Sequence, residues 1–160
     1  MANRFSISVE EGMEAPSWIN DVEPYLQKAI LALGYDDEEI SVLFCTDAFI
    51  QELNKQYRNI DAPTDVLSFE NGSEYEDEEG TKWFVAGDIA ISLETLPKNA
   101  EYFGVSEDEE LKRLLMHGML HLNGWDHGEE HVEKGVVPTD EMLRLQEETL
   151  PQFLSDKIIK

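Results

Sequence analysis

Cysteine is nearly absent from this chain of 160 residues, and long apolar runs are missing altogether. The single cysteine, Cys45, cannot form a disulfide within the chain, and its place in the apolar run "ISVLFC" predicts a buried, reduced thiol. No stretch approaches the roughly 18 consecutive apolar residues that a membrane-spanning helix needs. The opening residues, "MANRFSISVE", lack the basic segment followed by an apolar one that marks a secretory signal. We therefore expect a cytoplasmic protein with no membrane partner.

Basic residues are also scarce: the chain has 12 Lys and Arg against 35 Asp and Glu, a formal net charge of −23. Such a chain repels phosphate backbones at long range, so the overall charge argues against a nucleic-acid partner, although an average can hide a local patch. Part of the charge lies in "ENGSEYEDEEG", residues 70–80. This run lacks the ligand spacing of a calcium loop, and we interpret it as a solvated loop.

Apolar residues make up 41% of the chain, which is enough to build a core, and the length suits a single domain over residues 1–160. Hydrophobic periodicity and turn residues predict strands and helices in the order βαβαββααα. The fold class is thus α/β (α+β), one layered domain with a mixed sheet of about four strands covered by helices. The expected strands are residues 4–10, 39–45, 65–70 and 82–92, and the expected helices are 17–34, 48–58, 93–103, one that begins at Ser106, and 139–150.

The stretch "HGMLHLNGWDH", residues 117–127, holds three of the four histidines. Its helix begins at Ser106 and is apolar nearly all round in its second half, so we expect a central, buried helix. His117 and His121 are four apart and share a face. A continuing helix would carry His127 out of reach, but Gly124 can adopt the left-handed conformation that ends a helix and turns the chain back.

Three imidazoles at this spacing predict a metal site, with one Zn²⁺ per chain as the leading candidate and other divalent ions still open. Three protein ligands leave a fourth position for water, which is typical of a catalytic site. Two alternatives remain: the helix histidines bond within the core while His127 lies at the surface, or His131 replaces His127 as third ligand. Asp126 is the nearest carboxylate, and it could orient a ligand, carry a proton or stabilise the turn.

The spacing also matches that of metzincin proteases, H-E-x-x-H-x-x-G-x-x-H. Those enzymes carry a glutamate directly after the first histidine as general base, and this chain has Gly118 in that place. Peptide hydrolysis by that mechanism is therefore disfavoured.

A second group of residues lies in "NKQYRNIDAPTDVLSFE". Arg58 ends the expected helix 48–58, where it could complement the helix dipole or offer its planar fork of donors to a phosphate. Thr64 and Asp65 look like turn residues. Gly87 interrupts an apolar strand in "AGDIAIS", which indicates a bulge or a close backbone approach.

Taken together, these blocks resemble the YbeY family of bacterial endoribonucleases. "HGMLHLNGWDH" is similar to the family signature H-G-x-L-H-L-x-G-x-D-H, "NKQYRNIDAPTDVLSFE" resembles its second block and "GDIAIS" its third. The blocks stand in the family's order, and the resemblance covers most of the chain. Glu70 departs from the pattern, since the family usually has proline after the phenylalanine, and the acidic run that follows looks particular to this chain.

The resemblance implies a zinc-dependent endoribonuclease that prefers single-stranded RNA. It implies a role at the 3′ end of the small-subunit ribosomal RNA and in ribosome quality control, with the ribosome or its proteins as partners. On the same ground His117, His121 and His127 are the zinc ligands, and Arg58 is a catalytic or RNA-contacting residue. The inferred reaction is attack on a phosphodiester by metal-activated water. The alternatives are a zinc hydrolase of another substrate and a non-catalytic, metal-containing ribosome-assembly protein, which the acidity of the chain favours.

Overall fold

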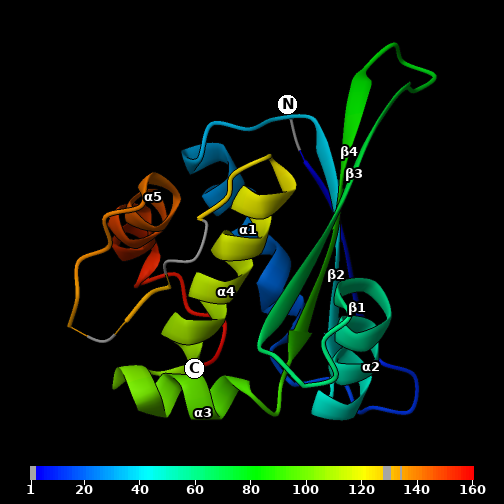
Figure 1. The fold of residues 1–160 in the computed structure, drawn as a ribbon. Coiled ribbons are helices and arrows are strands. Elements are labelled where there is room, and N and C mark those ends of the chain that lie inside the picture. Colours follow the sequence, from blue (N-terminus) through cyan, green and yellow to red (C-terminus); the bar gives the residue numbers. More distant parts are fainter. Residues whose placement is uncertain (1–2, 128–130, 134) are drawn as a thin grey trace.

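The computed structural model describes residues 3–127, 131–133 and 135–160. Four strands form one sheet in the order β1-β2-β4-β3 (Figure 1). The three strands β1, β2 and β4 run parallel, whereas β3 is antiparallel to β4, so the expected mixed sheet is confirmed. The strands are β1 (Arg4–Val9), β2 (Glu38–Cys45), β3 (Val66–Glu76) and β4 (Lys82–Ser92). The helices are α1 (Val22–Ala32), α2 (Asp47–Arg58), α3 (Leu96–Phe103), α4 (Glu107–Leu122) and α5 (Glu141–Thr149), with two short 3-10 helices, η1 (Ile19–Asp21) and η2 (Leu150–Phe153).

Helices cover both faces of this sheet, with α1 and α4 on one side and α2 on the other (Figure 1). Successive side chains of a strand point to opposite faces, and β2 follows this rule. Ile40, Val42 and Phe44 join the larger core under α1 and α4, while Cys45 packs with Ile50 of α2. The thiol of Cys45 is buried as expected, and burial raises its pKa to about 12.

Proline sets the true start of two helices. The helix expected over residues 17–34 begins at Val22, so Pro24 falls in its first turn. The helix expected from Leu93 begins at Leu96, again with proline in the first turn. A proline there costs no hydrogen bond, because the first N–H groups of a helix have no partner within it.

The N-terminal caps are partly those the sequence predicts. Ser106 caps α4 by accepting from the backbone N–H of Glu109, and Asp140 caps α5. The cap of α2 is Thr46. Thr46 accepts from the N–H of Phe49 at 3.3 Å, whereas Asp47 is the first helical residue and accepts from Ser92 instead.

The acidic run is not the loop that its composition predicts. The third strand continues through Glu76, and β3 and β4 form a long hairpin that projects beyond the helices (Figure 1). Asp77 closes the turn: it accepts from the N–H groups of Glu79 and Thr81 and from Nε1 of Trp83. Pairing with an apolar partner strand thus overrides the weak strand preference of acidic residues.

The helix α4 lies at the centre of the protein. Leu115, Met116, Met119 and Leu120 are fully buried, as expected for a helix whose second half is apolar nearly all round. None of the helices in the described parts of the chain has the length and apolar character to cross a membrane. The buried side chains of α4 hold in place the end of this helix that carries the histidines.

Candidate metal centre

Three histidines converge at the carboxyl end of α4. His117 and His121 come from its last two turns and His127 from the segment that follows. One ring nitrogen from each lies within 4.8 Å of those of the other two. The ring centroids are 4.6 Å apart for His117 and His121, and 5.1 and 5.2 Å from these two to His127.

The turn at Gly124 brings the third ring back. Gly124 has a φ of 89°, in the left-handed region that favours glycine, and its N–H donates to the carbonyl of His121. The next N–H, of Trp125, donates to the carbonyl of Leu120. The helix therefore ends in the way that the motif predicts.

The outer nitrogens of the two helix histidines have partners. Nδ1 of His121 lies 3.0 Å from the backbone carbonyl of Trp125, which can only accept, so this Nδ1 carries the hydrogen. Nδ1 of His117 lies 2.8 Å from Oε1 of Gln146, a residue of α5. The inner Nε2 atoms of the two rings face each other at 3.1 Å.

This donor set fits a transition metal ion. Two nitrogens bound tetrahedrally to zinc at roughly 2.0–2.1 Å lie about 3.3 Å apart, close to the Nε2 separation seen here. A bond from Nδ1 to an acceptor is also the usual support of a histidine that binds metal through Nε2. The three histidines can therefore hold a metal ion.

The electrostatics of the site keep the rings neutral. Burial, followed by the neighbouring His121, lowers the pKa of His117 from 6.5 to about 4. Burial and then His127 also lower the pKa of His121. Neutral imidazole is the form that binds metal, so the rings of His117 and His121 can bind an ion at neutral pH.

Gly118 faces away from the histidines. A Cβ at this position would lie 2.8 Å from Cδ1 of Ile89 in β4. Adjacent helical residues point about 100° apart, so the residue after His117 is turned toward the sheet. Gly118 has no side chain and so offers no general base, in line with the expectation against a protease mechanism.

The histidines lie in a cleft of about 660 Å³ lined by residues of α4, α5 and β3. Arg58, the last residue of α2, lines the same cleft. Its Nη2 donates to the carbonyl of Ser68 at 2.6 Å, and its guanidinium lies 5.1 Å from the ring of Phe69. Two candidates from separate parts of the sequence thus meet in one cavity.

Asp126 lies outside the cleft lining, whereas His131 is part of it. Asp126 is exposed and is not among the residues that line the cleft, although its charge opposes the lowering of the His121 pKa. His131 lines the cleft with its ring 5.5 Å from that of His127. Within the described residues the close cluster contains His127 rather than His131. The glutamates at positions 129 and 130 lie outside the described residues.

Sequence reasoning missed two carboxylates of the cleft. Asp65, interpreted as a turn residue, accepts from the N–H of Val66 and from Asn99, both at 2.7 Å. Its charge acts on His117, and that of Glu70 acts on His121, in both cases against the lowering of the pKa. Their only signal in the sequence was the position in the block after Arg58.

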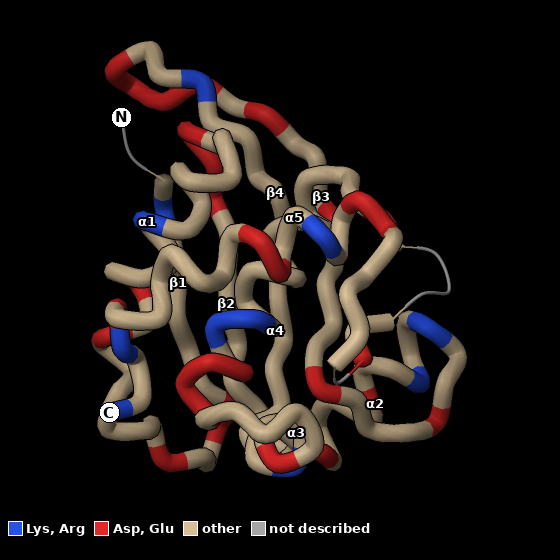
Figure 2. The backbone as a smooth tube through the Cα atoms, turned by 90° about the vertical axis from the view of Figure 1, so that its left-hand side faces the viewer, with Lys and Arg blue, Asp and Glu red and all other residues tan. Residues whose placement is uncertain are grey.

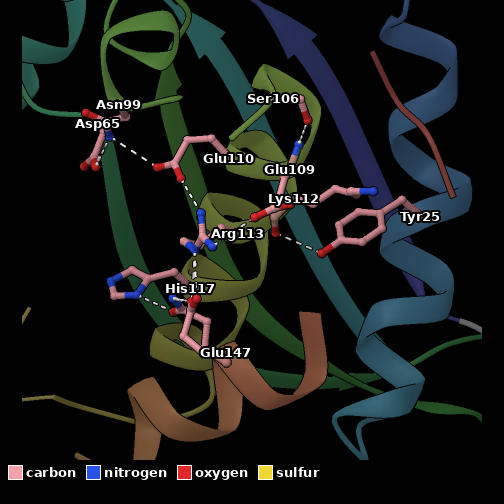
Figure 3. A network of polar contacts seen from close by, with 11 residues as sticks. Tyr25, Asp65, Asn99, Ser106, Glu109, Glu110, Lys112, Arg113, His117 and Glu147 are labelled. Carbon is pink, nitrogen blue, oxygen red and sulfur yellow. Dashed lines mark hydrogen bonds and ion pairs between the residues drawn. The ribbon is translucent and has the colours of Figure 1, made fainter. Parts of the chain in front are cut away.

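A buried network of polar side chains lies beside His117 and supports the site (Figure 3). Nη1 of Arg113 donates to Glu110 at 2.7 Å, and its Nε donates to Glu147 of α5 at 3.0 Å. Asn99 donates to both Asp65 and Glu110, although the second bond is long at 3.4 Å. Burial raises the pKa of Glu110, while Arg113 opposes that shift. The network connects α3, α4, α5 and the start of β3.

Gly87 confirms the predicted close approach of backbones. Its φ is 141°, and a Cβ there would lie 2.0 Å from the carbonyl oxygen of Phe69. The register of β2 against β4 shifts at the same place, between Glu39 and Ile40. Glycine at this point lets β3 lie close to β4 where it borders the cleft.

Comparison with known proteins agrees with this geometry. The family model described as Endoribonuclease YbeY matches residues 6–153. Proteins named Endoribonuclease YbeY are 50% identical in Treponema denticola, over 100% of this chain and 99% of the relative, and 49% identical in Treponema pallidum (strain Nichols), over 94% and 89%. A solution structure from Thermotoga maritima has a TM-score of 0.61 at 26% identity and covers 95% of this chain and 90% of that one. The match to the family model and the full-length relatives lead to one conclusion: this chain belongs to the YbeY family of endoribonucleases.

Proposed function

We propose that this chain is a zinc-dependent endoribonuclease that cleaves single-stranded RNA, and that residues 1–160 form its single domain. We further propose that it matures the 3′ end of the small-subunit ribosomal RNA in the cytoplasm and takes part in ribosome quality control. One observation carries the proposal: the three converging imidazoles and Arg58 line the same cleft, in a chain whose relatives are named endoribonucleases.

The residues of the cleft have separate tasks. His117, His121 and His127 hold the ion, which when bound would polarise a phosphoryl oxygen and lower the pKa of a water molecule. Arg58 neutralises negative charge on the phosphodiester during attack, because its guanidinium offers a planar fork of donors. Asp126 acts from outside the cleft, by orienting the ligand segment or by carrying a proton between the cleft and solvent.

Arg58 is suited to meet a phosphate in this acidic molecule, whose acidic residues are spread along the chain (Figure 2). The cleft lining contains two cationic residues, Arg58 and Arg113. Arg113 already pairs with carboxylates, those of Glu110 and Glu147 among them. Arg58 donates to a neutral carbonyl, and no carboxylate in the described residues forms an ion pair with it.

A single-stranded substrate suits the recessed position of the ion. A strand has to be splayed from its partner to bring a phosphodiester to half-buried histidines. We propose that a ribosomal partner supplies the positive surface that this chain lacks. Binding to free ribosomal RNA and to assembled particles tests this point, because equal affinity for both would remove the need for a partner.

The central experiment compares His121→Ala with His131→Ala. Both remove one imidazole of the cleft, but only the first removes a member of the close cluster. We expect His121→Ala to lose bound zinc, measured by elemental analysis, together with cleavage of a single-stranded RNA. His131→Ala should keep both. A folded His121→Ala protein that cleaves RNA at the wild-type rate would refute the catalytic proposal.

Cleavage by the wild-type protein separates the enzyme from a structural alternative. A ribosome-assembly protein with a structural metal would also lose zinc on His121→Ala, but wild-type protein would then show no cleavage of isolated RNA. Catalysis of that cleavage by purified, zinc-loaded wild-type protein, and its loss in a variant that still folds, would exclude the assembly protein.

A further inference from the structure

We propose that Gln146 is a positioning residue that fixes which nitrogen of His117 carries the hydrogen, and that Glu147 fixes Gln146 in turn. The inference rests on the proposed metal site, where His117 has to present a bare Nε2. It assigns a task to α5, which contributes no ligand to the histidine cluster.

The argument starts at the carboxylate of Glu147. Nε2 of Gln146 lies 2.8 Å from Oε2 of Glu147. A carboxylate only accepts, so the NH₂ end of the amide has to face it. The opposite end, Oε1, then lies 2.8 Å from Nδ1 of His117. Because that oxygen can only accept, Nδ1 carries the hydrogen and Nε2 keeps its lone pair.

Arg113 holds the carboxylate of Glu147, where this series of hydrogen bonds begins. Its Nε donates to both oxygens of Glu147, at 3.2 and 3.0 Å, and its Nη1 donates to Glu110 on the same helix (Figure 3). The residue Gln146 is 1% exposed, so water does not replace either of its two bonds. Burial makes a half-satisfied amide costly, and this fixes its orientation.

The two helix histidines both carry their hydrogen on Nδ1, and a different acceptor causes this in each ring. The backbone carbonyl of Trp125 accepts from Nδ1 of His121, and the side chain of Gln146 accepts from Nδ1 of His117. Two bare Nε2 atoms then face each other at 3.1 Å without a hydrogen between them. Their lone pairs repel unless a cation lies within reach, so the arrangement is prepared for a metal ion before the ion arrives.

The test reads the hydrogen position directly. Nitrogen-15 shifts of the histidine rings in metal-free protein at neutral pH distinguish Nδ1–H from Nε2–H. We expect wild-type His117 to be Nδ1–H, and Gln146→Leu to give a mixture of the two forms. The Zn²⁺ affinity of Gln146→Leu, measured by competition with a chelator, should fall by about 10- to 100-fold, the usual effect of losing such a support.

Two further variants sharpen the test. The double variant Gln146→Glu/Glu147→Gln keeps an accepting oxygen for Nδ1 and an amide–carboxylate bond between residues 146 and 147, so it should keep the Nδ1–H form of His117. Gln152→Leu makes the same change at an exposed glutamine and should leave both readouts unchanged. If Gln146→Leu does not fold, as judged by thermal unfolding, loss of the Nδ1–H form in the double variant Gln146→Glu/Glu147→Gln overturns the proposal.

A folded Gln146→Leu protein that keeps the Nδ1–H signal and the wild-type Zn²⁺ affinity also overturns it. The ring signals are measured without metal and without RNA. Failure of wild-type protein to cleave RNA would therefore contradict the proposed function but would leave this inference standing.

Discussion

Gly118 of α4 lies directly against Ile89 of β4. A Cβ added to the glycine would come within 2.8 Å of Cδ1 and 3.0 Å of both Cγ atoms of the isoleucine, which is 1% exposed. The absence of a side chain thus lets the helix that carries the histidines approach the sheet. The contact sets how closely α4 packs on β4.

Substitution of Gly118 should therefore destabilise the fold. We expect Gly118→Ala to lower the free energy of unfolding by about 1–3 kcal/mol, the usual cost of overpacking a core. Urea unfolding measures this loss. In the double variant Gly118→Ala/Ile89→Val, removal of Cδ1 should recover part of it. Losses that simply add in the double variant would show that Ile89 is not the obstacle.

Arg58 should affect cleavage without affecting metal content. Removal of one donor that stabilises transition-state charge typically costs about 10²–10³-fold in rate. We expect Arg58→Ala to lower single-turnover RNA cleavage by a factor of this order while zinc content stays at the wild-type level. The matched control is Lys55→Ala, an exposed cation in the same last turn of α2. Loss of zinc from Arg58→Ala would make its role structural instead.

The buried ion pair of Lys112 and Asp108 should contribute strongly to stability. Their side chains are 0% and 2% exposed, and Nζ of Lys112 lies 2.8 Å from Asp108 and 2.7 Å from the carbonyl of Phe153. We expect Lys112→Met to cost about 3–5 kcal/mol in urea unfolding, because it leaves a buried carboxylate without its cation.

A surface pair provides the control for that experiment. Lys28 pairs with Asp156 at 2.6 Å, but its side chain is 60% exposed. Lys28→Met should cost less than about 1 kcal/mol, as exposed pairs usually do. Equal losses in the two variants would mean that burial does not decide the strength of the pair.

The stability of metal-free protein should fall in mild acid because of His117. Its folded pKa of about 4 lies below the ordinary value of 6.5, so the unfolded chain binds more protons between these two values. The contribution of this ring is therefore complete above pH 6.5 and is lost as the pH falls toward 4. Because the ring is only half-buried, the free energy of unfolding lost between pH 6.5 and pH 4 is at most about 3 kcal/mol.

Urea unfolding of chelator-treated protein at a series of pH values measures this slope. The variant His117→Gln lacks the titrating ring, so its stability should fall less between pH 6.5 and 4. Parallel curves for wild type and variant would show that His117 titrates normally.

The cluster of three histidines was accessible to sequence reasoning because its geometry is local. Helical spacing places His117 beside His121, and Gly124 returns the chain within a few residues. The place of Arg58 followed from the family resemblance. The contact of Gln146 was not accessible, since it depends on how α5 packs against α4, and no local rule states that. The long β3 was missed for a similar reason, because pairing with β4 outweighs its acidic composition.

The acidic hairpin has a consequence for self-association. Within the described residues β3 pairs only with β4, so its other edge lacks a partner strand. Such an edge is a template for strand addition by a second copy, and charged side chains suppress that aggregation. The exposed Glu70, Glu74 and Glu76 repel an identical strand, and Arg58 occupies the carbonyl of Ser68. The acidity that counts against RNA binding thus keeps neighbouring molecules apart.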